Sequence, residues 1–150
     1  MFNILRPLIF KFSPEVAHSL AIKALKLNNI PYSKPKDNHI LETTFCEKKL
    51  SSPIGVAAGF DKNAEVYNPL FNLGFGFVEV GTITPKPQFG NPKPRVFRLE
   101  EDEALINRLG FNNSGSEQIS QTIKENNKKG FLGINIGPNK DSKDLSLIHI

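Results

Sequence analysis

Residues 54–81 read IGVAAGFDKNAEVYNPLFNLGFGFVEVG and contain a strand–helix–strand pattern. The short apolar run Ile54–Ala58 is typical of a buried strand. Asn63 is placed to cap a helix that runs to Leu73 before a glycine stops it. Phe75–Gly81 is a second apolar run of strand type. A strand, a helix and a second strand at this spacing predict a right-handed parallel β/α unit.

The same alternation continues downstream. Ser114–Glu117 has the sequence of a capping box and predicts the start of a helix, with Ile119 and Ile123 facing inward. A third strand is predicted at Phe131–Gly137. Three strands alternating with helices predict an α/β fold of consecutive parallel β/α units. Residues 82–113 form a long excursion after the second strand, and so long a connection is usually functional.

The first 40 residues have a different character. Residues 2–12 place five apolar side chains at helical spacing, and Ser13-Pro14 predicts the start of a second helix. The apolar arc of this second helix is wider than one flat contact requires. Its surplus is therefore expected to face a membrane or a tunnel between the helices, or to pack on the core as in an ordinary helical hairpin. Residues 28–40 are polar and proline-bearing, which is typical of a linker.

Charge and composition narrow the classes of function. Residues 1–50 hold eight Lys/Arg against four Asp/Glu, whereas residues 51–150 hold eleven of each, so the net charge of +4 comes from the first third. A nucleic-acid-binding domain normally spreads basic residues over its fold, so anionic lipid or an acidic partner is favoured over nucleic acid. The single cysteine excludes an internal disulfide, and the three histidines have no ligand-like spacing that predicts a metal site.

Candidate binding residues follow each predicted strand, where sites form in parallel β/α arrays. The small residues Ala58-Gly59 let a planar ligand approach the backbone, and Lys62 adds a cation. Thr82 offers a hydroxyl after the second strand, and Asn135 offers an amide in the third. Residues 107–113 are dense in groups that bind a polar heterocycle. Each element alone also fits an ordinary turn or helix start, and none matches a Walker or dinucleotide fingerprint.

Four stretches together carry a family resemblance: VAAGFDKNAE, FVEVGTITPKPQFGNPKPRVFRL, INRLGFNNSG and LGINIGPNKD. They resemble the class 2, quinone-dependent dihydroorotate dehydrogenases of pyrimidine (UMP) biosynthesis, and the similarity runs from about Phe2 to Asp144. That family folds as a (β/α)8 TIM barrel preceded by two membrane-associating helices that admit quinone. The resemblance implies that residues 1–40 are the helical membrane and quinone-tunnel segment with its linker. Residues 41–150 would then be the first part of the FMN-binding barrel.

The resemblance also implies site residues. Those implied to bind FMN are Ala58, Gly59, Phe60, Asp61, Lys62, Thr82 and Asn135. Those implied to bind dihydroorotate are Lys62, Asn107, Arg108, Leu109, Gly110 and Phe111. His18 and Arg98 match positions that line the quinone tunnel. Judged without the resemblance, His18 is a core or interface histidine and Arg98 is a solvent-facing charge.

The chemistry implied is a two-step oxidoreduction. Dihydroorotate gives a hydride to FMN while a serine removes a proton, and the electrons then pass to ubiquinone or menaquinone. The implied partners are therefore dihydroorotate and orotate, a quinone and membrane lipid. The implied location is peripheral on the membrane, at the cytoplasmic face of the inner membrane if the protein is bacterial.

The sequence departs from the family pattern at its end. The family's base serine lies beyond Ile150, and no serine present, Ser114 included, stands at that position, so no catalytic residue is assigned. A full barrel needs roughly 250 residues. We therefore expect the 150-residue chain to be truncated and inactive alone. Residues 145–150 (LSLIHI) do not continue the family pattern and are expected to be non-native.

Two alternatives remain open. One is another FMN-dependent barrel oxidoreductase, such as a cytosolic class 1 dihydroorotate dehydrogenase, which uses a cysteine base and lacks the membrane helices. Residues 1–40 argue against it. The other is a non-catalytic half-domain that binds a membrane surface or a partner, and flavin absorbance in the purified protein distinguishes it from an enzyme.

Overall fold

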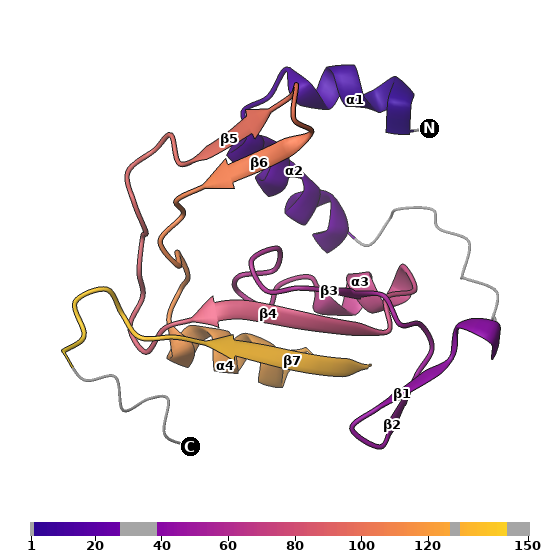
Figure 1. Cartoon of the computed structure of the whole chain (residues 1–150). Coiled ribbons are helices and arrows are strands. Elements are labelled where there is room, and N and C mark those ends of the chain that lie inside the picture. The colour runs from indigo at the N-terminus through magenta and orange to yellow at the C-terminus, as the bar shows by residue number, and fades with distance from the viewer. Residues whose placement is uncertain (1, 28–38, 127–129, 144–150) are drawn as a thin grey trace.

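The computed structural model of the chain describes residues 2–27, 39–126 and 130–143 (Figure 1). The helices are α1 Phe2–Phe10, α2 Pro14–Lys26, the 3-10 turn η1 His39–Leu41, α3 Tyr67–Asn72 and α4 Ser116–Glu125. The strands are β1 Thr43–Phe45, β2 Lys48–Leu50, β3 Gly55–Val56, β4 Phe77–Ile83, β5 Val96–Leu99, β6 Ala104–Asn107 and β7 Phe131–Ile136. Most of the predicted linker, residues 28–38, lies outside the described residues, as do residues 144–150.

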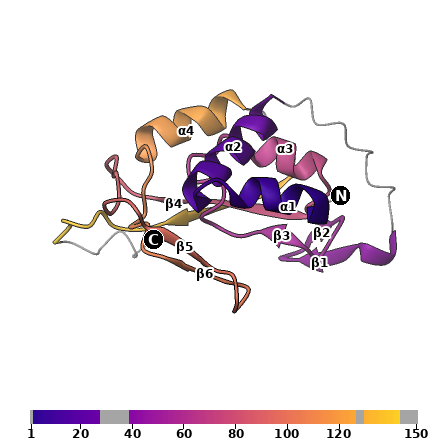
Figure 2. The same ribbon diagram turned by 90° about the horizontal axis from the view of Figure 1, so that it is seen from above.

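The centre of the fold is a parallel sheet with strand order β3-β4-β7. Val56 pairs with Val78, and Val80 pairs with Ile134, so strands that are successive in the β/α pattern lie side by side. The helices α3 and α4 connect these strands and cover the same side of the sheet (Figure 2). This arrangement confirms the predicted parallel β/α units, because right-handed crossovers place successive helices on one face.

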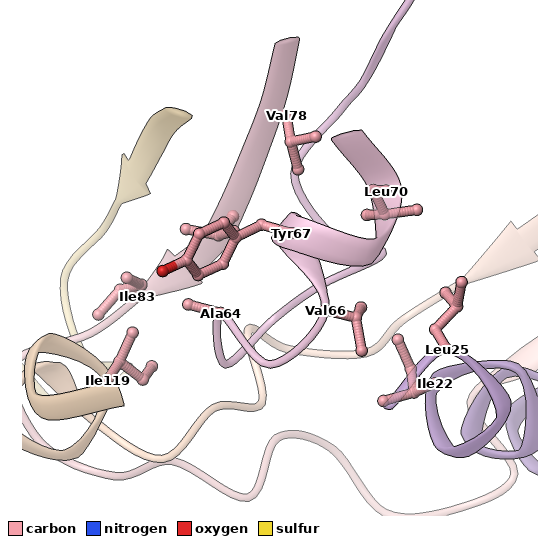
Figure 3. Packing of buried hydrophobic residues seen from close by; sticks show 10 residues of the cluster. Ile22, Leu25, Ala64, Val66, Tyr67, Leu70, Val78, Ile83 and Ile119 are labelled. Carbon is pink, nitrogen blue, oxygen red and sulfur yellow. The ribbon is translucent and has the colours of Figure 1, made fainter. Parts of the chain in front are cut away.

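Alternation along β4 separates the core from the opposite face of the sheet. Val78 and Val80 are fully buried and belong to one cluster with residues of α3 and α4. Figure 3 shows Val78 near Leu70 of α3. Glu79 lies between the two valines and therefore points to the other face. The buried cluster consists of Ile22, Leu25, Ala64, Val66, Tyr67, Leu70, Val78, Val80, Ile83 and Ile119.

Helix α2 belongs to this core through one side only. Ile22 and Leu25 are buried, and Figure 3 shows them beside Val66. Val16 and Leu20 remain 47% and 46% exposed, so packing on the core uses only part of the apolar arc. Within the described residues, no helix is both long and apolar enough to cross a membrane.

Two hairpins were not predicted from the sequence. Strands β5 and β6 pair antiparallel inside the excursion, and in Figure 1 this hairpin lies beside α1 and α2. Strands β1 and β2 form the other hairpin, where the Phe45 ring meets the Phe131 ring edge-to-face at 5.8 Å between centroids. The β5–β6 turn is Glu100–Glu103, which lacks the glycine or asparagine that usually marks a tight hairpin turn.

The predicted caps are wrong in detail. Helix α3 begins at Tyr67 rather than at Asn63, whose side-chain oxygen instead accepts the Ser114 N–H at 3.0 Å. The capping box at residues 114–117 does not form, because Gly115 is the N-cap residue and the Ser116 hydroxyl donates to Pro85 O at 3.1 Å. The Asn63 oxygen and the Ser116 hydroxyl each bond to a segment that is distant in sequence.

Candidate functional site

The turn that follows β3 is tied by its backbone to the middle of β4. Gly59 N–H donates to Gly81 O at 2.8 Å, and Gly81 N–H donates to Asp61 O at 3.0 Å. Gly59 has φ of +106°, and a Cβ added there would meet no atom within 4 Å. The backbone at Gly59 is therefore open to a ligand, as predicted for a small residue at a strand end.

The buried Asp61 carboxylate stabilises this turn through hydrogen bonds to backbone N–H groups. The Asp61 side chain is almost fully buried, with 1% exposed, and its carboxylate accepts the N–H groups of Glu65 and Val66 at 2.8 Å each. Burial raises the pKa of Asp61, while these two backbone donors oppose that shift. The carboxylate is thus occupied within the protein, which leaves only the backbone of Asp61 to face a ligand.

A polar network joins the ends of the three parallel strands. Thr82 Oγ1 donates to Asn135 Oδ1 at 2.6 Å, and Asn135 Nδ2 donates to Glu79 Oε1 at 3.0 Å. Ala58 N–H donates to Glu79 Oε2 at 3.5 Å. The structure therefore brings together Ala58, Thr82 and Asn135, all three predicted to bind cofactor. Glu79 was missed, although a lone charge inside the apolar run FVEVG was a usable signal.

A cavity of about 560 Å³ lies between α2, the turn after β3 and the β5–β6 hairpin. It is lined by residues predicted to contact FMN, dihydroorotate or quinone, namely His18, Gly59, Phe60, Asp61, Lys62, Arg98, Asn107 and Leu109. Apolar walls come from Ile22, Val96 and Leu105. Such a mixture of apolar walls and a few polar groups is typical of a small-molecule site.

The other predicted substrate residues lie outside this cavity lining. Arg108 donates to Pro94 O at 3.1 Å and is exposed, and Gly110 O accepts from the Gln88 side chain at 3.0 Å. Phe111 is 56% exposed. Their predicted contacts with substrate stay predictions.

His18 and Lys62 are two of the titratable groups that line the cavity. His18 Nε2–H donates to Phe60 O at 2.7 Å, and the two rings meet edge-to-face. Burial lowers the pKa of His18, the Phe60 carbonyl opposes this, and the nearby Lys62 charge adds to it. Burial also lowers the pKa of Lys62, whose Nζ donates to Gly59 O at 2.6 Å.

Arg98 links the β5–β6 hairpin to α1. Its Nη1 donates to Phe12 O at 2.7 Å, and its guanidinium lies 4.5 Å from the centroid of the Phe10 ring. Arg98 is therefore held against the N-terminal helices rather than free in solvent. It also lines the cavity, and its place in a quinone tunnel stays a prediction.

Sequence reasoning missed a second link, the ion pair between Glu15 and Arg95. The Arg95 side chain is only 7% exposed, and its Nε donates to both oxygens of Glu15 at 3.2 and 3.3 Å. Its Nη1 donates to the carbonyls of Phe89 and Asn91 at 2.7 and 3.0 Å. Arg95 thus joins α2 to the loop before β5. No local pattern marks a pair whose members stand 80 residues apart.

Glu15→Ala is expected to lower the free energy of unfolding by about 2 kcal/mol at neutral pH, because Arg95 would keep a buried charge without its carboxylate. Arg95 lowers the pKa of Glu15 from its ordinary 4.5. Stability from such a carboxyl is present above the unfolded pKa and is lost as the pH falls through the folded one. The difference between wild type and variant should therefore shrink in acid.

Urea unfolding at neutral pH and below pH 4.5 measures this effect. Glu101→Ala, in the exposed turn of the β5–β6 hairpin, serves as the control and should change stability little. A difference for Glu15→Ala that persists undiminished in acid would contradict the assignment.

Most of the chain is similar to one known protein family. Residues 40–147 match the sequence profile of the family described as dihydroorotate dehydrogenase. Three relatives carry the name dihydroorotate dehydrogenase (quinone). The Rhodospirillum rubrum protein is 50% identical over 93% of this chain and 38% of its own length. The Rhizobium etli protein is 52% identical over 91% of this chain and 38% of its own length. The Erythrobacter litoralis protein is 50% identical over 96% of this chain and 42% of its own length.

Solved structures agree with these sequence relatives. The dihydroorotate dehydrogenase of Eimeria tenella in complex with ferulenol is 42% identical, with a TM-score of 0.81 over 88% of this chain and 38% of its own. The ligand-free form of that enzyme gives a TM-score of 0.82 over 89% of this chain and 40% of its own. The chain thus spans about two fifths of the length of the proteins it matches.

Proposed function

Because the chain belongs to the dihydroorotate dehydrogenase family, we propose that it acts as part of a quinone-dependent enzyme that oxidises dihydroorotate to orotate. The observation that carries this proposal is the cavity between α2, the turn after β3 and the β5–β6 hairpin. It is lined at once by the turn Gly59–Lys62, by Asn107 and by the pair His18 and Arg98. A non-catalytic binding module would have no reason to gather these groups around one space.

The residues present fit a bound FMN. Gly59 leaves its backbone open, and Thr82 and Asn135 present a hydroxyl and an amide at the neighbouring strand ends. A flat polar ring system needs such close backbone approach and a few directed hydrogen bonds. The chemistry that FMN supplies when bound is acceptance of a hydride and passage of the electrons to quinone.

The chain's own residues would bind and orient the reactants. Lys62 places a positive charge in the cavity, and Asn107 adds an amide beside it, which suits a polar, negatively charged heterocycle such as dihydroorotate. The described residues include none to which we assign removal of the substrate proton. We propose that residues 41–150 supply the first part of an FMN-binding (β/α)8 barrel.

The N-terminal helices are proposed to admit quinone from a membrane surface. Between α2 and the hairpin the cavity has apolar walls, and Arg98 stands there with guanidinium N–H donors for quinone oxygens. His18 lines the same wall, and its one N–H is already donated to Phe60 O. Outside, the two helices and the turn between them expose the apolar side chains Leu5, Leu8, Phe12, Val16 and Leu20. Together with the basic first third, this surface supports peripheral binding to anionic lipid.

The proposed function predicts a yellow protein. The full-length product of the gene, once purified, should release FMN on denaturation, and anaerobic dihydroorotate should bleach its flavin absorbance. Adding ubiquinone or menaquinone should restore the absorbance. A colourless protein that takes up no FMN would support a non-catalytic half-domain instead. Bleaching that no quinone reverses would favour a different flavin oxidoreductase.

A further inference from the structure

Glu79 occupies an unusual position for a charged residue, the middle of the central parallel strand. Its neighbours Val78 and Val80 are fully buried on the helix side of β4. Glu79 therefore faces the same side as Asn135, which lies two residues beyond its register partner Gly133 on β7. Both carboxylate oxygens accept hydrogen bonds from donors there, one from Asn135 and one from Ala58 N–H.

These contacts determine which way the Asn135 amide points. A carboxylate accepts hydrogen bonds and donates none, so the NH₂ group of Asn135 must face Glu79. The amide oxygen then faces Thr82. The Thr82 hydroxyl has one hydrogen and donates it to that oxygen, with 2.6 Å between Oγ1 and Oδ1. What Thr82 has left for a ligand is lone pairs alone.

We propose that Glu79 is a positioning residue that sets the hydrogen-bond polarity of this strand-end site. Through Asn135 it makes Thr82 an acceptor, so the ligand group beside Thr82 must be a donor such as an imide N–H. Oxidised isoalloxazine carries one ring N–H, flanked by two carbonyls, and so offers that chemistry. The flavin part of this inference rests on the proposed function, whereas the polarity of Asn135 and Thr82 rests on the network alone.

The ligand-free test follows the Asn135 side-chain amide by NMR, with its signals assigned by their loss in Asn135→Asp. In wild type the two amide hydrogens should exchange slowly with solvent. Glu79→Leu should accelerate that exchange about two- to tenfold, as the loss of one hydrogen bond predicts. Glu101→Leu in the exposed hairpin turn should leave it unchanged. Unchanged exchange in Glu79→Leu overturns the proposal whether or not flavin binds.

The ligand test measures the FMN dissociation constant by fluorescence titration of the full-length protein. Glu79→Leu and Thr82→Val should each weaken FMN binding about tenfold. The double variant should also lose only about tenfold, because both changes break one network. Glu79→Gln keeps an oxygen for Asn135 and should lose about threefold. A loss of about 100-fold in the double variant would mean that the two changes act independently and would overturn a role through Thr82. Failure of the wild type to bind FMN would contradict the proposed function but not the polarity of the network.

Discussion

Replacing Lys62 by alanine is expected to slow the reduction of bound flavin by dihydroorotate about 100-fold, or about 2.7 kcal/mol. The Lys62 ammonium is held in the cavity by its bond to Gly59 O, and Asn107 lines the same space. A fixed cation there stabilises negative charge that develops as hydride is transferred, and its partial burial strengthens that effect.

Stopped-flow traces of the two half-reactions in the full-length protein measure this effect. Re-oxidation by quinone should change much less, since His18 and Arg98 rather than Lys62 are proposed to serve that route. Lys124→Ala, on the exposed side of α4, is the matched control. Normal flavin reduction in Lys62→Ala would show that the lysine only closes the turn onto Gly59.

Deleting residues 1–27 should reduce electron transfer to quinone by more than about 100-fold while sparing single-turnover reduction of the flavin. The deletion removes one wall of the cavity, including His18 and Ile22. It also removes the Phe12 carbonyl and the Phe10 ring that hold Arg98. Quinone would then lose this cavity wall with His18, and Arg98 would lose the contacts that hold it in place.

A milder variant separates lipid binding from loss of the core, to which Ile22 and Leu25 contribute. Changing the exposed Leu8, Val16 and Leu20 to glutamine keeps those buried contacts. Co-sedimentation with phosphatidylglycerol vesicles should fall at least about tenfold, because three apolar side chains no longer leave water. Reduction of a short-chain, soluble quinone should be retained. Equal vesicle binding by wild type, the triple variant and the deletion would exclude these helices as the membrane contact.

Local patterns were sufficient for the parallel β/α units. The strands near Val56, Val78 and Ile134 were predicted because an apolar run and its flanking glycines depend only on neighbouring residues. The start of α2 at Pro14 was predicted for the same reason, since proline at the first helical position needs no distant partner. The strand-end positions of Thr82 and Asn135 followed from these units, because parallel strands end at one edge.

What sequence alone could not decide is which polar group meets which. Asn63 and the Ser114–Glu117 box looked like local caps. The Asn63 side chain instead bonds to Ser114 N–H, and Ser116 within the box bonds to Pro85, in segments that only folding brings near. The pairing of Glu79 with Asn135 and that of Arg95 with Glu15 could not be recognised, because the partners lie 56 and 80 residues apart. Apolar periodicity can be read from adjacent residues. A hydrogen bond between distant segments instead requires their donor and acceptor to be placed to within a few tenths of an ångström. The sequence by itself therefore determined the family, the strands and the residues available at their ends; only the tertiary structure decided their pairing and the cavity between α2 and the hairpin.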